Sequence, residues 1–282
     1  MPGCASYQLA PRCYPALGRC YASVLRVLSD AELGVGRHNV TAEQDFIAEL
    51  KNFDSEAQHA AFFLYSWLSI DHAASKSQRL LNRLNRTPTF WLTIRTALSS
   101  SAYITISRVF DQSSPHNIDR LCGLAQNNQE IFSRDALAAR KRQDSPNEPD
   151  WLPHYLDNAY YPNPNDFRKL RRRIAESRRI FERVIRPARN QFLAHRQVID
   201  REEVNRLYGQ GTIMELWKLS KFLLQFHDVL WELLHNGRRP HFRPRRYSVA
   251  AMFRNAPTGS AATERIVREV IEAMSLIEAP ER

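Results

Sequence analysis

The chain has 282 residues, of which 43% are hydrophobic, and a net charge of +10. This composition supports a packed core and excludes a disordered chain, and no apolar run approaches the roughly 18 residues needed to cross a membrane. Nine glycines against fifteen prolines, without stretches of alternating β-branched residues, favour helix over sheet. We therefore expect an all-α, cytoplasmic protein.

Residues 1–40 give no clear structural pattern. They lack the continuous apolar stretch of a signal peptide, and the spacing of Cys4, Cys13 and Cys20 matches neither a zinc pair nor a redox motif. We interpret this part as a poorly ordered or variable segment, which is either a tail or translation begun upstream of the natural start. No metal and no cofactor are expected for the chain.

Two capping-box patterns predict the first helices. Thr41 with Gln44 indicates a helix over 42–52, and Ser55 with Gln58 indicates a second helix over 56–84.

A third long helix is expected from Pro88, which suits a first helical turn, to about Asp111. A shorter helix should start at Pro115, and another should cover 129–141. The stretch 143–165 is rich in proline, so we interpret it as an insertion or linker outside the core.

The second half of the chain predicts three more helices. Asp166 can cap a helix whose apolar residues recur at three- and four-residue steps, and Pro187 either kinks this helix or begins a fresh one. Thr212 with Glu215 forms a third capping box, which opens a buried helix that stops before Gly237. The stretch "TERIVREVIEAMSLI" predicts a terminal amphipathic helix.

The positive charge is concentrated in two segments. Residues 168–189 contain ten Arg or Lys against two Glu, and residues 238–254 contain six Arg and no acidic residue. The net positive charges of these two segments add up to more than the net charge of the whole chain, so the rest of the chain is net negative. This distribution is typical of polyanion binding, with nucleic acid as the expected partner, whereas the alternative is a solvated helix face paired with acids from other helices.

The basic helix ends in a trio that suits RNA cleavage, Arg189, Asn190 and His195. A neutral histidine can accept the proton of a ribose 2′-OH, and a fixed arginine can stabilise the negative charge of the phosphorane. Neighbouring guanidiniums favour the neutral imidazole that a base requires. In a helix, Arg189 and His195 stand about 120° apart, so one copy would enclose a phosphate poorly, and we expect a homodimer with a shared cleft.

Further residues are candidates around this trio. Arg108 and Asp111, at the end of the third helix, either brace the motif or pair locally. The expected nucleic-acid contacts are Arg171, Arg172, Arg178, Arg179, Arg183, Arg186 and Arg196.

The stretch "RNQFLAH" resembles the signature of the HEPN superfamily, in which an arginine is followed by a polar residue and then by a histidine. Together, "PARNQFLAHR" and "FWLTIRTALSSSAYITISRVFD" resemble the AbiU-type HEPN proteins of bacterial phage-defence and toxin–antitoxin loci, over roughly residues 41–236. The resemblance implies a helical bundle, dimerisation through the motif helices and metal-independent endoribonuclease activity that halts growth during infection. By motif position, it implies Arg189, Asn190 and His195 as the active residues.

We therefore expect a HEPN-like bundle over 41–236 with the Pro-rich insertion 143–165, followed by a basic loop and C-terminal helix over 237–282. The expected function is RNA cleavage, with RNA, a second copy and a cognate antitoxin, either a nucleotidyltransferase or a small acidic protein, as partners. The alternatives are a non-catalytic nucleic-acid-binding or adaptor module and a purely structural partner subunit.

Overall fold

The computed structural model describes residues 41–142, 149–190, 210–242 and 262–279, and every regular element within these ranges is a helix. The all-α prediction is therefore confirmed. In chain order the helices are α2 (Ala42–Lys76), α3 (Gln78–Leu84), α4 (Pro88–Phe110), α5 (Ile118–Asn127), the 3₁₀ turn η1 (Gln129–Phe132), α6 (Arg134–Arg142), α7 (Leu152–Asn158), α8 (Pro164–Ile180), the π-helical turn η2 (Phe181–Ile185), α9 (Arg186–Ala188), α11 (Gln210–Asn236) and α13 (Ala262–Glu278).

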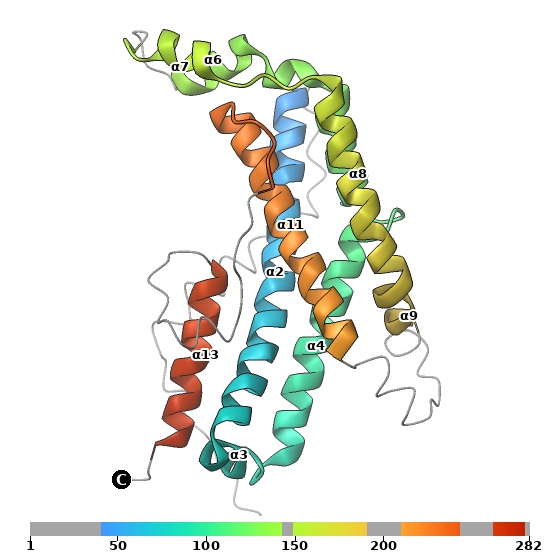
Figure 1. The fold of residues 1–282 in the computed structure, drawn as a ribbon, viewed down its shortest axis with the longest axis vertical. Coiled ribbons are helices and arrows are strands. Elements are labelled where there is room, and N and C mark those ends of the chain that lie inside the picture. The colour runs from blue at the N-terminus through green and yellow to red at the C-terminus, as the bar shows by residue number, and fades with distance from the viewer. Residues whose placement is uncertain (1–40, 143–148, 191–209, 243–261, 280–282) are drawn as a thin grey trace, which may run out of the picture. The chain divides into compact units, whose positions relative to one another are not determined.

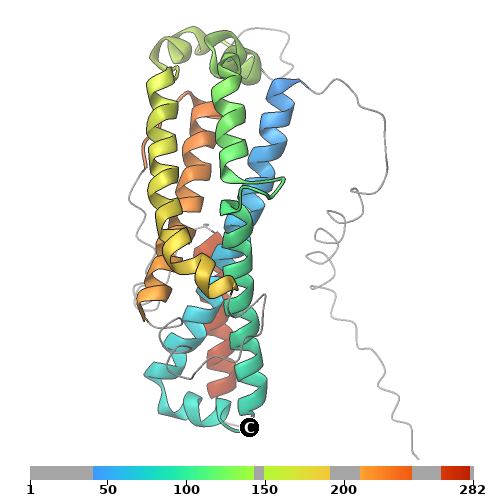
Figure 2. The same cartoon turned by 90° about the vertical axis from the view of Figure 1, so that its right-hand side faces the viewer.

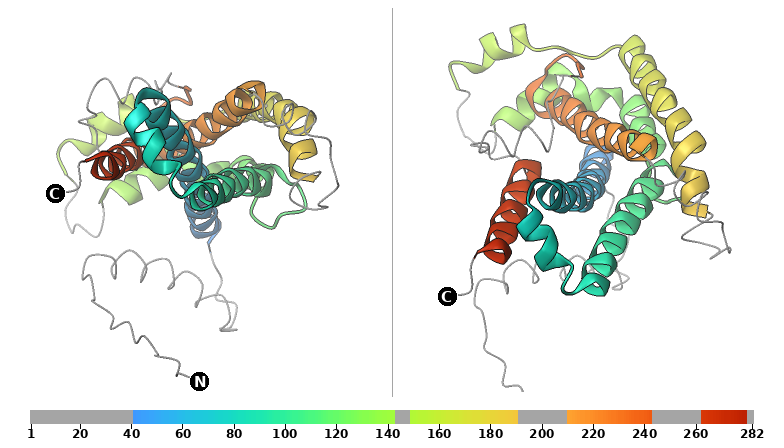
Figure 3. Two further views of the ribbon diagram at one scale, coloured as in Figure 1. Left: turned by 90° about the horizontal axis from the view of Figure 1, so that it is seen from below. Right: turned by 60° about the horizontal axis from the view of Figure 1, so that its bottom comes forward.

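Helix α2 is the centre of the bundle, with α4, α11 and α13 packed around it (Figures 1 and 3). It begins at Thr41, whose hydroxyl and Gln44 form the predicted capping box. The second predicted box is wrong, because α2 runs unbroken through Ser55 and is 35 residues long in all. The buried side chains of Phe53, Ala57 and Ala60 lie on both sides of Ser55, so packing keeps this stretch helical where the local pattern suggested a start.

The break comes at Ser77, well before the predicted end at 84. Its backbone is extended (φ −130°, ψ 110°), and its hydroxyl accepts a hydrogen bond from the backbone N–H of Leu80, which starts α3. Helix α4 spans the predicted range from Pro88, and Asp111 is its C-cap.

The shorter helices also differ from the prediction at their ends. Helix α5 begins at Ile118 rather than at Pro115, because the side chain of Asn117 accepts from the backbone N–H of Arg120 at 2.9 Å. The helix predicted over 129–141 is divided into η1 and α6, with Ser133 in extended conformation between them.

The Pro-rich stretch is not wholly outside the core, as the sequence suggested. It contains α7, whose Leu152 and Leu156 are buried against Leu137 and Ala138 of α6. A small secondary core therefore forms at this end of the bundle (Figure 1).

Helix α8 is capped by Asn163 rather than by Asp166. Pro164 occupies the first turn, and Asp166 is the third residue of a capping box, accepting from the backbone N–H of Asn163 at 3.0 Å. The apolar face of α8 is buried as predicted, through Phe167, Leu170 and Ile174.

A π-helical turn, η2, lies between α8 and Pro187. In η2 the backbone N–H of Arg186 donates to the carbonyl of Phe181, five residues earlier. The wider π turn makes room for Pro187, which has no N–H and whose ring would crowd a preceding carbonyl in a regular α-helix. The chain stays helical through α9, but its axis bends (Figure 2), which corresponds to the kink among the two alternatives that the sequence left open. The rest of the alternative, a fresh helix to about Leu207, lies outside the described residues.

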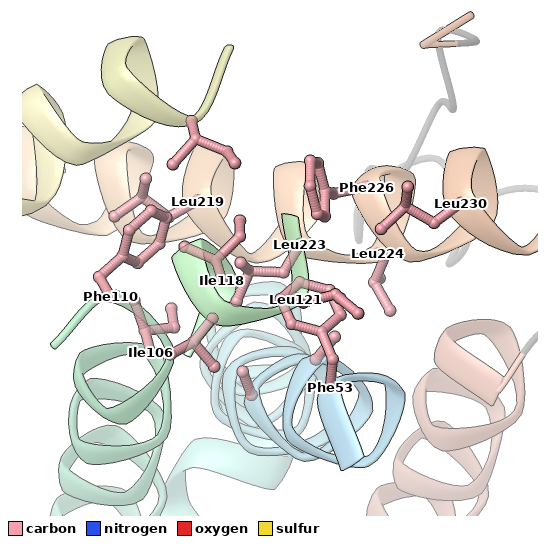
Figure 4. Packing of buried hydrophobic residues seen from close by; sticks show 14 of the residues in the cluster. Phe53, Ile106, Phe110, Ile118, Leu121, Leu219, Leu223, Leu224, Phe226 and Leu230 are labelled. Atoms are coloured by element: carbon pink, nitrogen blue, oxygen red, sulfur yellow. The ribbon is translucent and has the colours of Figure 1, made fainter. Parts of the chain in front are cut away.

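Helix α11 supplies one wall of the main core. Its leucines and Phe226 point towards Phe53 of α2 and towards Ile106 and Phe110 of α4 (Figure 4). Thr212 lies inside this helix and does not open it, contrary to the prediction. The helix ends before Gly237, as predicted, and Gly237 has a positive φ of 53°.

Helix α13 is part of the bundle. It packs against α2 and α3, with Val267 and Met274 buried. Arg83 of α3 also donates to the carbonyl of Ile277 at 2.6 Å. Within the described ranges, no helix is both long and apolar enough to span a lipid bilayer.

Candidate RNA-cleaving site

The structure describes part of the predicted trio. Arg189 and Asn190 follow α9 directly and lie within the described residues, whereas His195 and Arg196 lie outside them, in the stretch 191–209. The geometry of the site is therefore that of Arg189 and the side chains around it.

The guanidinium of Arg189 is held on two sides. Its Nε donates to Oδ1 of Asn190 at 3.1 Å, and its Nη1 contacts Oδ2 of Asp111 at 3.4 Å. The side chain is 31% exposed. The contacts join the start of the motif to the end of α4, so Asp111 contacts the motif from a neighbouring helix, which is one of the two alternatives that the sequence left open.

Asp111 is itself oriented by the turn that follows α4. Both the hydroxyl and the backbone N–H of Ser113 donate to its Oδ1, at 2.8 and 3.1 Å. These bonds lower the pKa of Asp111 below its usual value, with a further contribution from Arg189. Because Ser113 occupies one carboxylate oxygen, the other remains directed at Arg189.

A small hollow of about 100 Å³ lies beside this ion pair. The stacked rings of Phe110 and Phe181, 5.4 Å apart, connect α4 to η2 at this point. The residues that line the hollow come from the end of α4, the end of α8, η2 and α9: Phe110, Asp111, Gln112, Arg178, Phe181, Glu182, Arg186 and Arg189.

Sequence reasoning did not identify Gln112, Ser113 or Glu182 as parts of this site. The Asp-Gln-Ser order was a usable signal for Ser113, because an aspartate at the start of a turn commonly accepts from the residue two positions later. For Glu182, which stands among arginines, no sequence signal separates a pocket residue from a surface residue.

The predicted RNA-binding arginines form two groups. Four of these arginines are exposed, and within the described ranges no acidic side chain pairs with them: Arg172, Arg179, Arg183 and Arg186. Positions 172, 179 and 183 share one helix face, opposite the buried Leu170 and Ile174. This basic face, defined here by Arg172, Arg179, Arg183 and Arg186, leads along α8 to Arg189.

Arg178 and Arg171 are placed differently. Arg178 points inward and is only 16% exposed, because it donates to the carbonyl of Phe110 at 2.9 Å and pairs with Asp119 of α5. We therefore leave it out of the proposed RNA contacts. Arg171 is exposed, but its Nε donates to Gln126 at 2.6 Å.

Arg108, the other supporting candidate, does not contact Arg189 within the described ranges. It forms a two-pronged contact with Oε2 of Glu56 on α2, at 2.8 and 3.2 Å. Its partner belongs to α2 and is 52 residues away, so within the described residues Arg108 neither contacts Arg189 nor pairs with a residue near it in sequence.

Across the described residues, no group of three or more His, Cys, Asp or Glu is placed to hold a metal ion. The residues that the structure brings together around Arg189 are instead donors and carboxylates suited to positioning a guanidinium.

Comparison with known proteins identifies one family. The model of the HEPN family described as AbiU2 matches residues 43–251, which is most of the chain and includes Arg189, Asn190 and His195. No curated protein and no solved structure matches. The helical fold agrees with this family, and the chain therefore belongs to the AbiU2 family of HEPN proteins, a family related to abortive infection.

Proposed function

We propose that this protein is a metal-independent endoribonuclease of a phage-defence or toxin–antitoxin system. The observation that carries the proposal is the placement of Arg189. Its Nε and Nη1 are oriented by Asn190 and Asp111, while no described side chain bonds to its Nη2. That nitrogen is left to bind a phosphate oxygen at the end of the basic face of α8.

The reaction needs a base and a positive charge. His195 takes the proton from a ribose 2′-OH, and the 2′-oxygen attacks the adjacent phosphorus. Arg189 stabilises the extra negative charge of the phosphorane, and the 5′-oxygen leaves with a proton from an imidazolium. The products are a 2′,3′-cyclic phosphate and a 5′-hydroxyl, so RNA is cut and DNA, which lacks the nucleophile, is not.

Two copies of the chain supply the complete set of groups. We propose a homodimer whose two-fold axis passes near His195, so that one histidine acts as the base while the histidine of the second copy protonates the leaving oxygen. The pairing also brings two copies of Arg189 to one phosphate. A cross-linking map that places the two copies of His195 on opposite outward faces would contradict this arrangement.

The direct test is cleavage of a mixed RNA substrate by purified His195→Ala and Arg189→Ala proteins in the presence of a chelator. Loss of the general base should slow cleavage by about 10²–10⁴-fold, and Arg189→Lys, which keeps the charge without the fork, should recover only part of the arginine's contribution. Arg95→Ala is a matched control, because Arg95 is also half-exposed and also paired, with Asp71 at 2.7 Å.

Unchanged cleavage by His195→Ala would reject the mechanism. RNA binding by a wild-type protein that never cleaves RNA would favour the alternative, a binding or adaptor module. Toxicity on overexpression, relieved by either substitution, would connect the activity to growth arrest. A cognate antitoxin, a nucleotidyltransferase or a small acidic protein, is proposed as the partner that restrains the activity, and its co-purification with the wild-type chain tests this.

A further inference from the structure

A second basic hollow lies on α8, four turns before Arg189. It has a volume of about 360 Å³ and lies between α8 and the chain that follows α11. The residues that matter for its chemistry are Lys169, Leu170, Arg172, Arg173, His241 and Phe242. Leu170 is buried and gives the hollow an apolar component, whereas the remaining polar groups are mainly cationic.

Arg173 is held in a fixed position within this hollow. Its guanidinium carbon lies 5.3 Å from the centre of the Phe242 ring, and its Nη1 contacts Glu176 at 3.1 Å. Phe242 is in turn packed parallel to Phe222 of α11, with ring centres 5.9 Å apart. The stack therefore connects Arg173 to the core of the bundle, yet the Arg173 side chain is 54% exposed.

This combination suits a nucleoside phosphate. A planar guanidinium that is already ordered by an aromatic ring offers a flat surface on which a nucleobase stacks, at little further cost in side-chain entropy. Lys169, Arg172 and His241 surround the same space and offer donors for a phosphate. Asp166, the carboxylate of the hollow, is buried, and its Oδ2 accepts hydrogen bonds from Tyr160 and from the backbone of Asn163. Its Oδ1 lies 3.9 Å from Nζ of Lys169, whose side chain is 74% exposed.

The position of the hollow favours a strand over a free nucleotide. Arg172 belongs both to the hollow and to the basic face, and the exposed arginines continue from it to Arg189. Arg173 and Arg189 are 16 residues apart, which is about 24 Å of helix at 1.5 Å per residue. A stacked strand that rises about 3.4 Å per nucleotide covers this length with about seven nucleotides.

We propose that the hollow at Arg173 and His241 is a second RNA-binding subsite, which binds a nucleotide of the substrate about seven positions away from the cleaved bond. The proposal rests on the proposed function in taking RNA as the ligand, but it does not require cleavage. The hollow then contributes to substrate selection, because only an RNA strand long enough to reach from the hollow to Arg189 gains contacts at both sites.

The experiment measures binding of a fluorescent single-stranded RNA of about twelve nucleotides, long enough to span both places, by anisotropy in the His195→Ala background. Arg173→Ala should raise the Kd about tenfold, the effect of losing one stacked base. Arg173→Lys keeps the charge but lacks the plane, so it should recover little of the loss. Arg95→Ala is again the matched control and should leave the Kd nearly unchanged.

Equal Kd values for the Arg173→Ala and Arg95→Ala proteins would overturn the subsite. Full recovery by Arg173→Lys would overturn the stacking role. Weakened binding of AMP with unchanged binding of the RNA would assign the hollow to a free nucleotide and reject the strand. Because binding is measured without cleavage, an inactive wild-type enzyme whose RNA binding depends on Arg173 would contradict the proposed function while supporting this subsite.

Discussion

Gly237 is the position where a single methyl group should perturb the molecule most clearly. It follows α11 with a φ of 53°, in the left-handed region that side chains other than hydrogen disfavour. A Cβ built there would lie 2.8 Å from Cδ2 of Leu137 and 2.9 Å from Cβ of Ala159. The carbonyl of Gly237 also accepts a hydrogen bond from Tyr160 at 2.6 Å, so the two chain segments cannot separate without losing it.

The expected cost of Gly237→Ala combines two effects. The left-handed backbone costs about 1–2 kcal/mol for an alanine, and the extra methyl in a packed site costs about 1–3 kcal/mol. Leu137 can move the end of its side chain, whereas the Cβ of Ala159 moves only with its backbone. We therefore expect the free energy of unfolding, measured by urea denaturation, to fall by about 2–5 kcal/mol.

Gly123→Ala is the matched control for this substitution. Gly123 lies within α5, and an added Cβ there would have only Arg171 Nη2 nearby, at 3.9 Å. Since alanine is favoured over glycine in a helix by about 1 kcal/mol, this variant should be as stable as the wild type or slightly more stable. A Gly237→Ala protein that unfolds at the same urea concentration as the Gly123→Ala protein would refute the reasoning.

Three further predictions concern the site and its surroundings. Arg178→Ala should lower the free energy of unfolding by about 2–3 kcal/mol, because charge-assisted bonds to partly buried groups are lost. Arg179→Ala should change the free energy of unfolding by less than about 0.5 kcal/mol and should instead weaken RNA binding. Urea titration and RNA anisotropy on both proteins test these two expectations. Asp111→Asn should reduce kcat/KM for RNA cleavage about tenfold to a hundredfold by releasing the oriented guanidinium. Because hydrogen bonds from the following turn lower the pKa of Asp111 below 3.8, the carboxylate is ionised above that pH, and a loss that varies across a neutral pH profile would argue against its role. Burial, with Arg140 and Lys141 nearby, lowers the pKa of His235 below 6.5. The unfolded chain therefore binds a proton at His235 more readily than the folded protein does, and the free energy of unfolding should fall as the pH drops below 6.5. A His235→Gln protein whose urea midpoint has the same pH dependence as the wild type would contradict this.

The long amphipathic patterns predicted the helices well, and the local start signals did so less well. Helix α4 occupies the predicted range, and the helix that ends before Gly237 does so because of that glycine's backbone. The boxes at Ser55 and Thr212 were wrong because a capping pattern is decisive only where the chain would otherwise leave the helix. Around Ser55, where apolar residues are buried on both sides, the same residues lie inside the helix.

The sequence predicted only part of the candidate site. The contact of Asp111 with Arg189 was expected as one of two alternatives, because both lie at the ends of predicted helices. The inward direction of Arg178 followed in principle from its position four residues after the buried Ile174, but the abundance of neighbouring arginines hid it. The hollow at Arg173 and His241 joins segments about seventy residues apart, and no periodicity within either segment indicates their contact.

The π turn at Phe181–Ile185 has a consequence for how this part of the chain tolerates insertions and deletions. A π turn holds one more residue than the α turn that it replaces. Removal of one residue there would restore a regular helix while leaving the buried side chains of α8 in place. Because the wide turn already absorbs the extra residue, everything after it, including Arg189, would keep nearly its direction towards Asp111. The same deletion within the regular helix of α8 would instead rotate everything after it by about 100° and carry Arg189 away from Asp111. The π turn is therefore the place in this helix where the chain can lose one residue without turning the motif.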